Sequence, residues 1–289
     1  MEKLTIKKLQ DILDSDRVLI AEEDRITYAY DGTQLLTQLP DAILIPNNAM
    51  EVSAILQLAN QENFKVVPRG SGTGLSGGSI PTENSVVVLM NHWNKILEID
   101  QENLTAWVEP GVITGKIHET VEEMGLFYPP DPSSMSICTI GGNVAENAGG
   151  LRGLKYGVTK DYIMGLEVIL PNGDISHFGG KNVKDVAGYN LKEVFVGSEG
   201  TLGIFSKILL KLVPKPKSTK TMLALFDSID QAARTVSDII AARIIPTTLE
   251  FLDRITIKSV EDFAKIRLPV NSAALLLIEV DGHPAQGEE

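Results

Sequence analysis

An eleven-residue stretch, PRGSGTGLSGG at residues 68–78, constrains this chain more than any other part of its sequence. Five of these residues are glycine, and the strand-like run Phe64–Val67 leads directly into them. Glycine is favoured where the backbone needs positive φ or has to lie against a ligand. The N–H groups of such a loop form a concave surface that binds anions, phosphate above all. The stretch therefore predicts a phosphate-binding loop at the end of a strand.

A Rossmann-type dinucleotide motif is one interpretation of this loop, because Gly72, Gly74 and Gly77 have the spacing G-x-G-x-x-G. That motif requires a helix that begins within the loop, so that the pyrophosphate meets the helix N-terminus. Here the apolar run Ser85–Met90 follows instead and predicts a strand. We therefore expect a phosphate loop of a different fold. A flexible linker fits poorly, because apolar strands flank the loop on both sides.

Composition narrows the function classes. The chain has 289 residues, enough for two domains, and a formal net charge of −12, which argues against a nucleic-acid partner. An anionic ligand must then be held by local N–H groups and Arg69 rather than by the overall field. The single cysteine, Cys138, excludes an internal disulfide and a cysteine cage for a metal, and no metal site is predicted. No apolar stretch reaches the length of a membrane span and no signal peptide opens the chain, so we expect a cytoplasmic protein.

The hydrophobic pattern predicts helices and strands along the whole chain. Residues 42–78 form a β-α-β unit whose helix is capped by residues 46–48, and Asn172-Gly173 marks a hairpin. The almost entirely apolar run 273–280 predicts a strand at the centre of a sheet, and residues 281–289 lead towards a further helix. We expect helices over residues 4–13, 49–59, 114–124, 228–242 and 253–264, and strands over residues 42–45, 64–68, 86–90, 96–99, 104–108, 166–170, 175–178, 205–213, 222–226, 248–252 and 273–280.

A proline-rich loop and two further glycine regions follow the first glycine loop. Residues 128–134 read YPPDPSS, and the three prolines favour a rigid, extended loop. Residues 139–150, TIGGNVAENAGG, contain glycine pairs that let the backbone approach a flat ligand closely. Residues 196–204, VGSEGTLGI, precede a strand, and residues 214–217, PKPK, indicate a domain boundary.

Four motifs, PRGSGTGLSGG, PPDPSS, TIGGNVAENAGG and VGSEGTLGI, follow one another along the chain. In this order they resemble the FAD-binding domain of the vanillyl-alcohol oxidase and p-cresol methylhydroxylase (PCMH) superfamily of FAD-linked oxidases. The chain most resembles the branch of D-lactate dehydrogenase, D-2-hydroxyglutarate dehydrogenase and the glycolate oxidase D-subunit, densely over about residues 40–214 and more loosely elsewhere. The resemblance implies an α+β fold. It consists of an N-terminal arm at residues 1–40, a PCMH-type FAD-binding domain of two α/β subdomains at residues 41–214, and part of an α/β, ferredoxin-like cap domain at residues 215–289.

The resemblance also implies where FAD binds. Residues 69–75 would wrap the pyrophosphate, and residues 130–134 and 141–150 would line the ribityl and isoalloxazine region. Glu199, Gly200 and Ile204 would complete the adenine side. The full set of expected cofactor-binding residues is Pro68, Arg69, Gly70, Ser71, Gly72, Thr73, Gly74, Leu75, Pro130, Asp131, Ser133, Ser134, Gly141, Gly142, Ala145, Asn147, Gly149, Gly150, Tyr156, Gly157, Glu199, Gly200 and Ile204.

Two positions depart from the covalent members of the superfamily, and they imply non-covalent FAD. Thr73 stands about where those members place a histidine. Cys138 lies near the position where doubly linked relatives attach flavin to cysteine, but nothing basic beside it would make a thiolate, and we interpret it as a small buried thiol. Residues 184–191, KDVAGYNL, resemble the family's K-D-x-x-G-Y-D-L stretch, with Asn190 where aspartate is usual.

The resemblance implies an FAD-dependent oxidoreductase that removes hydride from the α-carbon of a D-2-hydroxy acid, glycolate or D-lactate, and yields the 2-oxo acid. It also implies other subunits of a glycolate-oxidase-type complex, including an iron–sulfur subunit, and neither a nucleic-acid partner nor direct membrane insertion. Catalytic residues are not assigned, because in the family they lie downstream of Glu289. Two alternatives stay open: a truncated FAD-binding module without turnover of its own, and a flavoprotein of the ether-lipid synthase branch. The sequence does not identify the 2-hydroxy acid, the electron acceptor or the oligomeric state.

Overall fold

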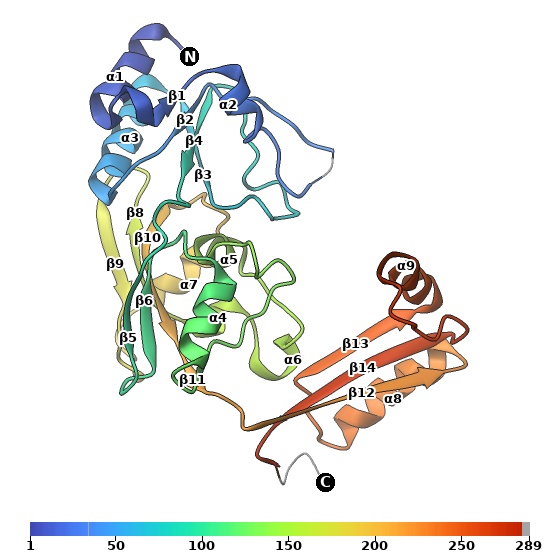
Figure 1. The fold of residues 1–289 in the computed structure, drawn as a ribbon. Helices are drawn as coiled ribbons and strands as arrows, with labels where there is room; N and C mark the ends of the chain where they lie inside the picture. The colour runs from blue at the N-terminus through green and yellow to red at the C-terminus, as the bar shows by residue number, and fades with distance from the viewer. Residues whose placement is uncertain (34, 285–289) are drawn as a thin grey trace. The chain divides into compact units, whose positions relative to one another are not determined.

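A computed structural model describes residues 1–33 and 35–284 of the chain. The chain divides into two compact units (Figure 1). The first comprises Met1–Tyr128, Ser133–Ala148 and Thr159–Val213, and the second comprises Pro129–Pro132, Gly149–Val158 and Pro214–Glu289. Two short segments from the middle of the sequence thus belong to the same unit as the C-terminal sheet.

The first unit contains a sheet with three parallel strands. Its order is β1-β2-β4-β3, with β1 at Val18–Leu19, β2 at Ala42–Leu44, β4 at Ser85–Leu89 and β3 at Lys65–Arg69. Every residue of β2 and β4 is buried, which is the pattern of parallel strands covered on both faces. β2 and β3 both pair with β4 in parallel, so the expected β-α-β unit forms with a third strand between its two strands.

Helix α3, Ala49–Glu62, connects β2 to β3 and begins at the predicted capping signal. The side chain of Asn48 accepts a hydrogen bond from Glu51 N at 3.0 Å, and its amide donates to the Glu51 carboxylate at 3.1 Å. The first of these bonds satisfies an N–H group that has no partner within the first helical turn. The helix ends at Asn63, whose φ of 55° is left-handed and stops the helical repeat.

A second sheet of the first unit is antiparallel throughout. Its order is β5-β6-β10-β8-β9, with β5 at Ile96–Asp100, β6 at Thr105–Val108, β10 at Ile204–Lys211, β8 at Ile163–Ile169 and β9 at Ile175–Gly179. β8 and β9 form the predicted hairpin around Asn172-Gly173. All of these strands lie close to the predicted positions.

Shorter elements complete the described part of the first unit. They are α1 (Lys3–Leu13), η1 (Ser15–Arg17), α2 (Glu22–Ile26), α4 (Thr114–Glu122), β7 (Leu126–Phe127), which pairs with β11 (Val213–Pro214), α5 (Ile140–Glu146), η2 (Thr159–Tyr162) and α7 (Leu191–Phe195). α1 and α4 confirm predicted helices. No helix within residues 1–33 and 35–284 is long and apolar enough to cross a bilayer.

Helix α5 falls within the second glycine region, where the sequence pattern predicts no helix. Glycine costs about 1 kcal/mol relative to alanine inside a helix, and two adjacent glycines stand in the first turn of α5. Tertiary packing overrides this cost, because Ile140 and Val144, one turn apart, are both fully buried. Gly141 is itself required by packing, since an added Cβ would lie 2.7 Å from Pro110 Cβ.

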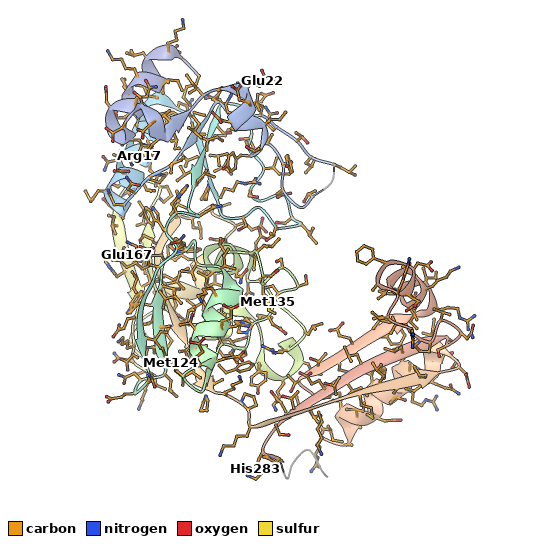
Figure 2. All side chains as sticks on the ribbon, in the orientation of Figure 1. Arg17, Glu22, Met124, Met135, Glu167 and His283 are labelled. Carbon is orange, nitrogen blue, oxygen red and sulfur yellow. The ribbon has the colours of Figure 1, made fainter. Side chains whose placement is uncertain are left out.

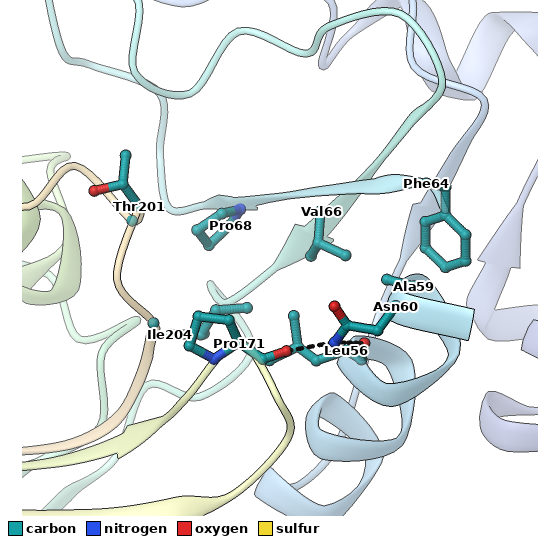
Figure 3. Close-up of a pocket in the computed structure, with 11 residues that line it drawn as sticks. Leu56, Ala59, Asn60, Phe64, Val66, Pro68, Pro171, Thr201 and Ile204 are labelled. Atoms are coloured by element: carbon teal, nitrogen blue, oxygen red, sulfur yellow. Dashed lines mark hydrogen bonds between the residues drawn. The ribbon is translucent and has the colours of Figure 1, made fainter. Parts of the chain in front are cut away.

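Helix α3 and the turn between β8 and β9 connect the two sheets of the first unit. Ser53 Oγ donates to Gly173 O at 2.5 Å. Asn60 Nδ2 donates to Pro171 O at 2.7 Å (Figure 3). One core cluster combines residues of α1, α3 and the parallel sheet with residues of β8 and β10. The two sheets therefore share a core.

The buried side chain of Glu167, labelled in Figure 2, lies on β8. It accepts hydrogen bonds from Ser206 Oγ at 2.8 Å and Lys207 Nζ at 3.0 Å, and His177 Nε2 lies 2.7 Å away. Burial is the largest influence and raises the pKa of Glu167, but the three hydrogen-bond partners outweigh it and leave the pKa below its ordinary value. His177 is thus engaged in a structural contact.

The second unit contains a three-stranded antiparallel sheet of order β12-β14-β13 (Figure 1). Its elements are α6 (Gly153–Tyr156), β12 (Ser218–Phe226), α8 (Ile229–Ala241), β13 (Thr248–Asp253), α9 (Arg254–Ala264) and β14 (Ala274–Gly282). β14 is the central strand, as its apolar sequence predicts, and it packs through Leu276 and Ile278 against Ala232 of α8. Of the residues expected to lead towards a further helix, 285–289 lie outside the described part of the chain.

We expect Gly173→Ala to lower the free energy of unfolding by about 2–4 kcal/mol. Gly173 has φ +91°, and an added Cβ would lie 2.7 Å from Gln57 Cγ and 3.0 Å from Ser53 O. Gly125→Ala is the matched control, because Gly125 has φ +72° but no atom within 4 Å of an added Cβ. Urea unfolding followed by tryptophan fluorescence should show the larger loss at Gly173. Equal losses would contradict the packing argument.

Candidate functional site

The glycine loop runs from β3 to β4 without forming a helix, as the sequence predicts. Gly72 and Gly77 have φ values of +69° and +82°, a region that favours glycine. The residues from Ser71 to Gly74 are partly exposed. Among the described residues, no hydrogen bond engages the backbone N–H groups from Ser71 to Ser79. A run of unpaired N–H groups in a glycine loop is the arrangement that binds anions.

The Arg69 side chain packs against this loop. Only 6% of the residue is exposed, and an added Cβ at Gly72 would lie 2.2 Å from Arg69 Nη2. Nη1 donates to Ser79 O at 3.4 Å, and the guanidinium carbon lies 5.6 Å from the centre of the Tyr28 ring. Burial is the main influence and lowers the pKa of Arg69, whereas the nearby carboxylate of Asp31 acts in the opposite direction. The guanidinium therefore contacts two separate parts of the loop.

Residues 28–33 also pack on the loop, although the sequence assigns them to an N-terminal arm. An added Cβ at Gly32 would lie 2.7 Å from Gly74 O. Ser79 Oγ donates to Asp31 Oδ2 at 3.4 Å. The Asp-Gly pair is a turn signal that marks this segment, but the sequence alone does not show which loop it contacts. These residues are therefore missing from the expected set.

The second glycine region reaches the loop through Thr139 and α5. An added Cβ at Gly70 would lie 2.1 Å from Thr139 Oγ1, so the two segments approach as closely as glycine allows. At the other end of α5, Asn147 has φ 50° and its side chain accepts a hydrogen bond from the backbone of η2 at 2.9 Å. Gly142 and Ala145, also in the expected set, are partly buried on the same helix.

The third glycine region contacts both of the others. Glu199 N donates to Ala145 O at 2.9 Å, and Glu199 itself has a left-handed φ of 51°. An added Cβ at Gly200 would lie 2.8 Å from Pro68 Cγ. The structure thus brings the three glycine regions of the first unit together, as a shared ligand site requires.

Two carboxylates stand beside the loop. Glu146, at the end of α5, accepts hydrogen bonds from Ser76 Oγ at 2.9 and 3.1 Å. An added Cβ at Gly78 would lie 3.0 Å from Glu146 Oε1 and 3.3 Å from Glu199 Oε2. Burial is the largest influence and raises the pKa of Glu146; the Ser76 hydrogen bond lowers it, but repulsion from Glu199 and Asp31 adds to the rise. Glu146 is not in the expected set, because its position beside the loop depends on α5.

A pocket of about 190 Å³ opens beside the start of the loop (Figure 3). Pro68, Gly200 and Ile204, all in the expected set, form part of its lining. Apolar residues of α3 and β3 and the turn residue Pro171 contribute to the rest. Gly200 and Ile204, which are expected on the adenine side, therefore border one cavity.

Six of the expected residues lie in the second unit: Pro130, Asp131, Gly149, Gly150, Tyr156 and Gly157. The Asp131 carboxylate accepts a hydrogen bond from Arg152 N at 3.1 Å and pairs with Arg152 Nε at 3.4 Å. An added Cβ at Gly150 would lie 2.2 Å from Asp131 Oδ1. Tyr156 OH donates to Asp281 Oδ2 at 2.8 Å, which joins α6 to the end of β14. Asp131, Gly150 and Tyr156 thus make contacts within the second unit.

The other expected residues have simpler surroundings. Leu75 is 79% exposed, Ser133 is exposed, and Ser134 O accepts a hydrogen bond from Cys138 N at 2.7 Å. Residues 184–191 are all exposed. Cys138 is buried and its Sγ lies 3.4 Å from Thr114 Oγ1, so the expectation of a buried thiol is confirmed. In the described ranges 1–33 and 35–284, no group of three or more His, Cys, Asp or Glu side chains could hold a metal.

Two protein families match the chain. Residues 40–179 match the family described as FAD binding domain, and residues 215–289 match the family described as FAD linked oxidases, C-terminal domain. The chain belongs to the FAD-linked oxidases. FAD is accordingly the cofactor of this family member, and the resemblance seen in the motifs is confirmed.

Several sequence relatives of this FAD-linked oxidase chain have names that refer to 2-hydroxy acids. Glycolate oxidase subunit GlcD of Bacillus subtilis (strain 168) is 61% identical over 258 residues, which are 89% of this chain and 55% of that protein. D-Lactate dehydrogenase of Anaerostipes hadrus is 34% identical over 89% of this chain and 54% of its own length. D-2-Hydroxyglutarate dehydrogenase of Stutzerimonas stutzeri (strain A1501) is 34% identical over 78% of this chain and 49% of its own length. The chain spans about half the length of these relatives.

Solved structures show the fold. An alkyldihydroxyacetonephosphate synthase matches 99% of this chain and 57% of its own with a TM-score of 0.82 at 23% identity. p-Cresol methylhydroxylase with substrate bound matches 99% of this chain and 61% of its own with a TM-score of 0.77 at 20% identity. At these identities the likeness concerns the fold alone, and it confirms the predicted PCMH-type architecture followed by part of a second α/β domain.

We expect Glu146→Gln to raise the melting temperature of the cofactor-free chain near neutral pH. A carboxyl whose pKa is raised by folding contributes stability below its unfolded pKa, and this contribution is lost as pH rises through the folded pKa. Glutamine keeps an acceptor for Ser76 without the charge that Glu199 and Asp31 oppose. Circular dichroism melts from about pH 4 to about pH 8 should show the difference shrinking towards the acid end. Glu102→Gln, in an exposed turn, is the control. A variant without added stability at the neutral end would contradict this reading.

Proposed function

We propose that this chain is the FAD-binding part of an oxidoreductase of the same type as glycolate oxidase subunit GlcD, which oxidises a D-2-hydroxy acid, glycolate or D-lactate, to the 2-oxo acid. The observation that carries the proposal is the 61% identity to glycolate oxidase subunit GlcD over 258 residues. The other relatives named for D-2-hydroxy acids support the same substrate class.

The glycine loop supports the position that we propose for the FAD pyrophosphate. Its N–H groups from Ser71 to Ser79 have no partner among the described residues, and its glycines leave phosphate oxygens room to approach. A ligand with two negative charges needs such directed donors here, because Glu146 and Glu199 stand beside Gly78. The residues of the loop and of the first unit therefore fit the group.

The remaining residues of the expected set belong to the same proposal. In the first unit they lie on α5 and in the third glycine region, which both contact the loop. In the second unit they are residues 130–131, 149–150 and 156–157. Bound FAD supplies a flavin ring that accepts hydride, and the part of this chain is to bind and orient it.

We expect FAD to be released completely when the loaded chain is precipitated with acid. Thr73 is not a nucleophile for flavin attachment, and Cys138 is buried and lies beside Thr114 Oγ1. Absorbance of the supernatant at the flavin bands measures the release. Colour that stays in the pellet of the wild type and leaves the pellet of Cys138→Ser would overturn non-covalent binding.

We expect glycolate or D-lactate to reduce the flavin of the loaded chain poorly or not at all under anaerobic conditions, because no catalytic residue is assigned within this chain. Gly72→Val provides the baseline without flavin, because a β-branched side chain at φ +69° would also collide with Arg69. Rapid bleaching of the flavin by either acid would contradict this expectation and show that the chain turns over by itself. A chain that takes up no FAD would overturn the whole proposal.

We further propose that the protein works in a complex with other subunits, including an iron–sulfur subunit that takes electrons from the flavin. The support is that relatives from Bacillus subtilis and Escherichia coli (strain K12) are named as subunits of glycolate oxidase. The cytoplasmic location expected from the sequence is part of this proposal.

A further inference from the structure

Protein groups enclose the Arg69 guanidinium from several directions. Nη2 occupies the space that a side chain at Gly72 would need, and Nη1 donates to Ser79 O at 3.4 Å. The ring of Tyr28 lies 5.6 Å from the guanidinium carbon, at a distance typical of a cation–π contact. The carboxylate of Asp31 acts on the same charge. Only 6% of the residue is exposed.

This environment differs from that of an arginine that binds phosphate. A phosphate-binding guanidinium presents two parallel N–H donors to the ligand, and its charge is available to the ligand. At Arg69 the exposed surface is small, one donor is engaged by Ser79 O, and Asp31 offsets the charge. What the side chain does contact are two points of the loop that are seven residues apart in sequence, Gly72 and Ser79.

We propose that Arg69 is a positioning residue, which holds the loop so that its N–H groups converge on the pyrophosphate, and that the guanidinium does not itself bind the phosphates. The inference rests on the proposed FAD site at this loop. Arg69 links the positive-φ turn at Gly72 to the far end of the loop at Ser79, and residues 28–31 brace it from outside.

The two roles make opposite predictions for lysine at this position. Lysine keeps a mobile positive charge, which can still pair with a phosphate, but it lacks the flat guanidinium that packs between Tyr28 and Gly72. If Arg69 positions the loop, Arg69→Lys therefore fails as badly as Arg69→Met. If Arg69 binds phosphate, Arg69→Lys keeps the charge and therefore loses clearly less affinity than Arg69→Met.

FAD titration followed by quenching of flavin fluorescence tests this. We expect Arg69→Lys and Arg69→Met to weaken FAD binding by similar factors, about tenfold or more. Lys65→Met is the matched control, because it removes a positive charge from an exposed position of the same strand and should leave Kd unchanged. A clearly smaller loss of affinity in Arg69→Lys than in Arg69→Met would overturn the proposal.

Ionic strength gives a readout that a structural defect alone would not move. Loss of an ion pair with the ligand would make Kd less sensitive to salt. The proposal therefore predicts that Kd rises by the same factor between about 50 mM and about 500 mM salt in the wild type and in Arg69→Met. A smaller rise of Kd in Arg69→Met would overturn the proposal. If neither Arg69 variant folds, Tyr28→Leu keeps the charge but removes the bracing ring. Weaker FAD binding in that variant supports the proposal, and unchanged binding contradicts it.

Failure of this inference is distinguishable from failure of the proposed function. Wild type that binds no FAD contradicts the proposed FAD site itself. Wild type that binds FAD, together with a clearly smaller loss of affinity in Arg69→Lys than in Arg69→Met, contradicts the role of Arg69 alone.

Discussion

The backbone N–H groups of residues 71–79, unpaired among the described residues, constrain how the first unit can pack around its glycine loop. A buried N–H without a partner costs about as much as a lost hydrogen bond, so a run of them persists only where solvent or a ligand reaches them. The loop meets this condition by staying partly exposed from Ser71 to Gly74. Its flanks are fixed by contacts of Gly70 with Thr139 and of Ser76 with Glu146. β4, the strand that follows the loop, contributes Val86 and Val88 to the core that the two sheets share.

The glycines of the motifs meet two different requirements, close packing of the backbone and contact with a ligand. The sequence alone does not distinguish between them. Gly70 leaves no room for a Cβ beside Thr139, and Gly141 leaves none beside Pro110, so both are required by packing before any ligand is considered. Gly72 instead combines a positive φ with the space that Arg69 occupies. The motifs therefore mark where segments of backbone converge. Ligand contact follows most directly at the glycine-rich stretch Ser71–Ser79, because its N–H groups have no protein partner among the described residues.

Local patterns predict most of the fold, and contacts distant in sequence account for what they miss. The strand at Ala274–Gly282 is central because its residues are apolar on both faces, which a short window of sequence shows. Helix α5 is missed because its glycines lower helix propensity and only tertiary packing offsets them. Tyr28 and Asp31 are missed as parts of the site for a similar reason, since their positions beside Arg69 depend on how the chain returns to the loop. The family follows from the order of the motifs, whereas the individual cofactor contacts stay predictions.

The charges around the loop also show how a chain of net charge −12 can hold an anion without a positive surface. Asp31 offsets Arg69, and Glu146 and Glu199 stand beside Gly78, so long-range attraction towards the loop is weak. Backbone N–H dipoles act at short range, are oriented by the fold, and do not titrate. Burial, together with the charges of Glu199 and Asp31, raises the pKa of Glu146, so a negative charge beside the loop already meets repulsion. Such a site binds a free anion weakly, because the anion meets the same carboxylates and makes no other contacts. It favours a ligand whose phosphates are held in place by flat groups bound on either side, and this is the construction of a dinucleotide.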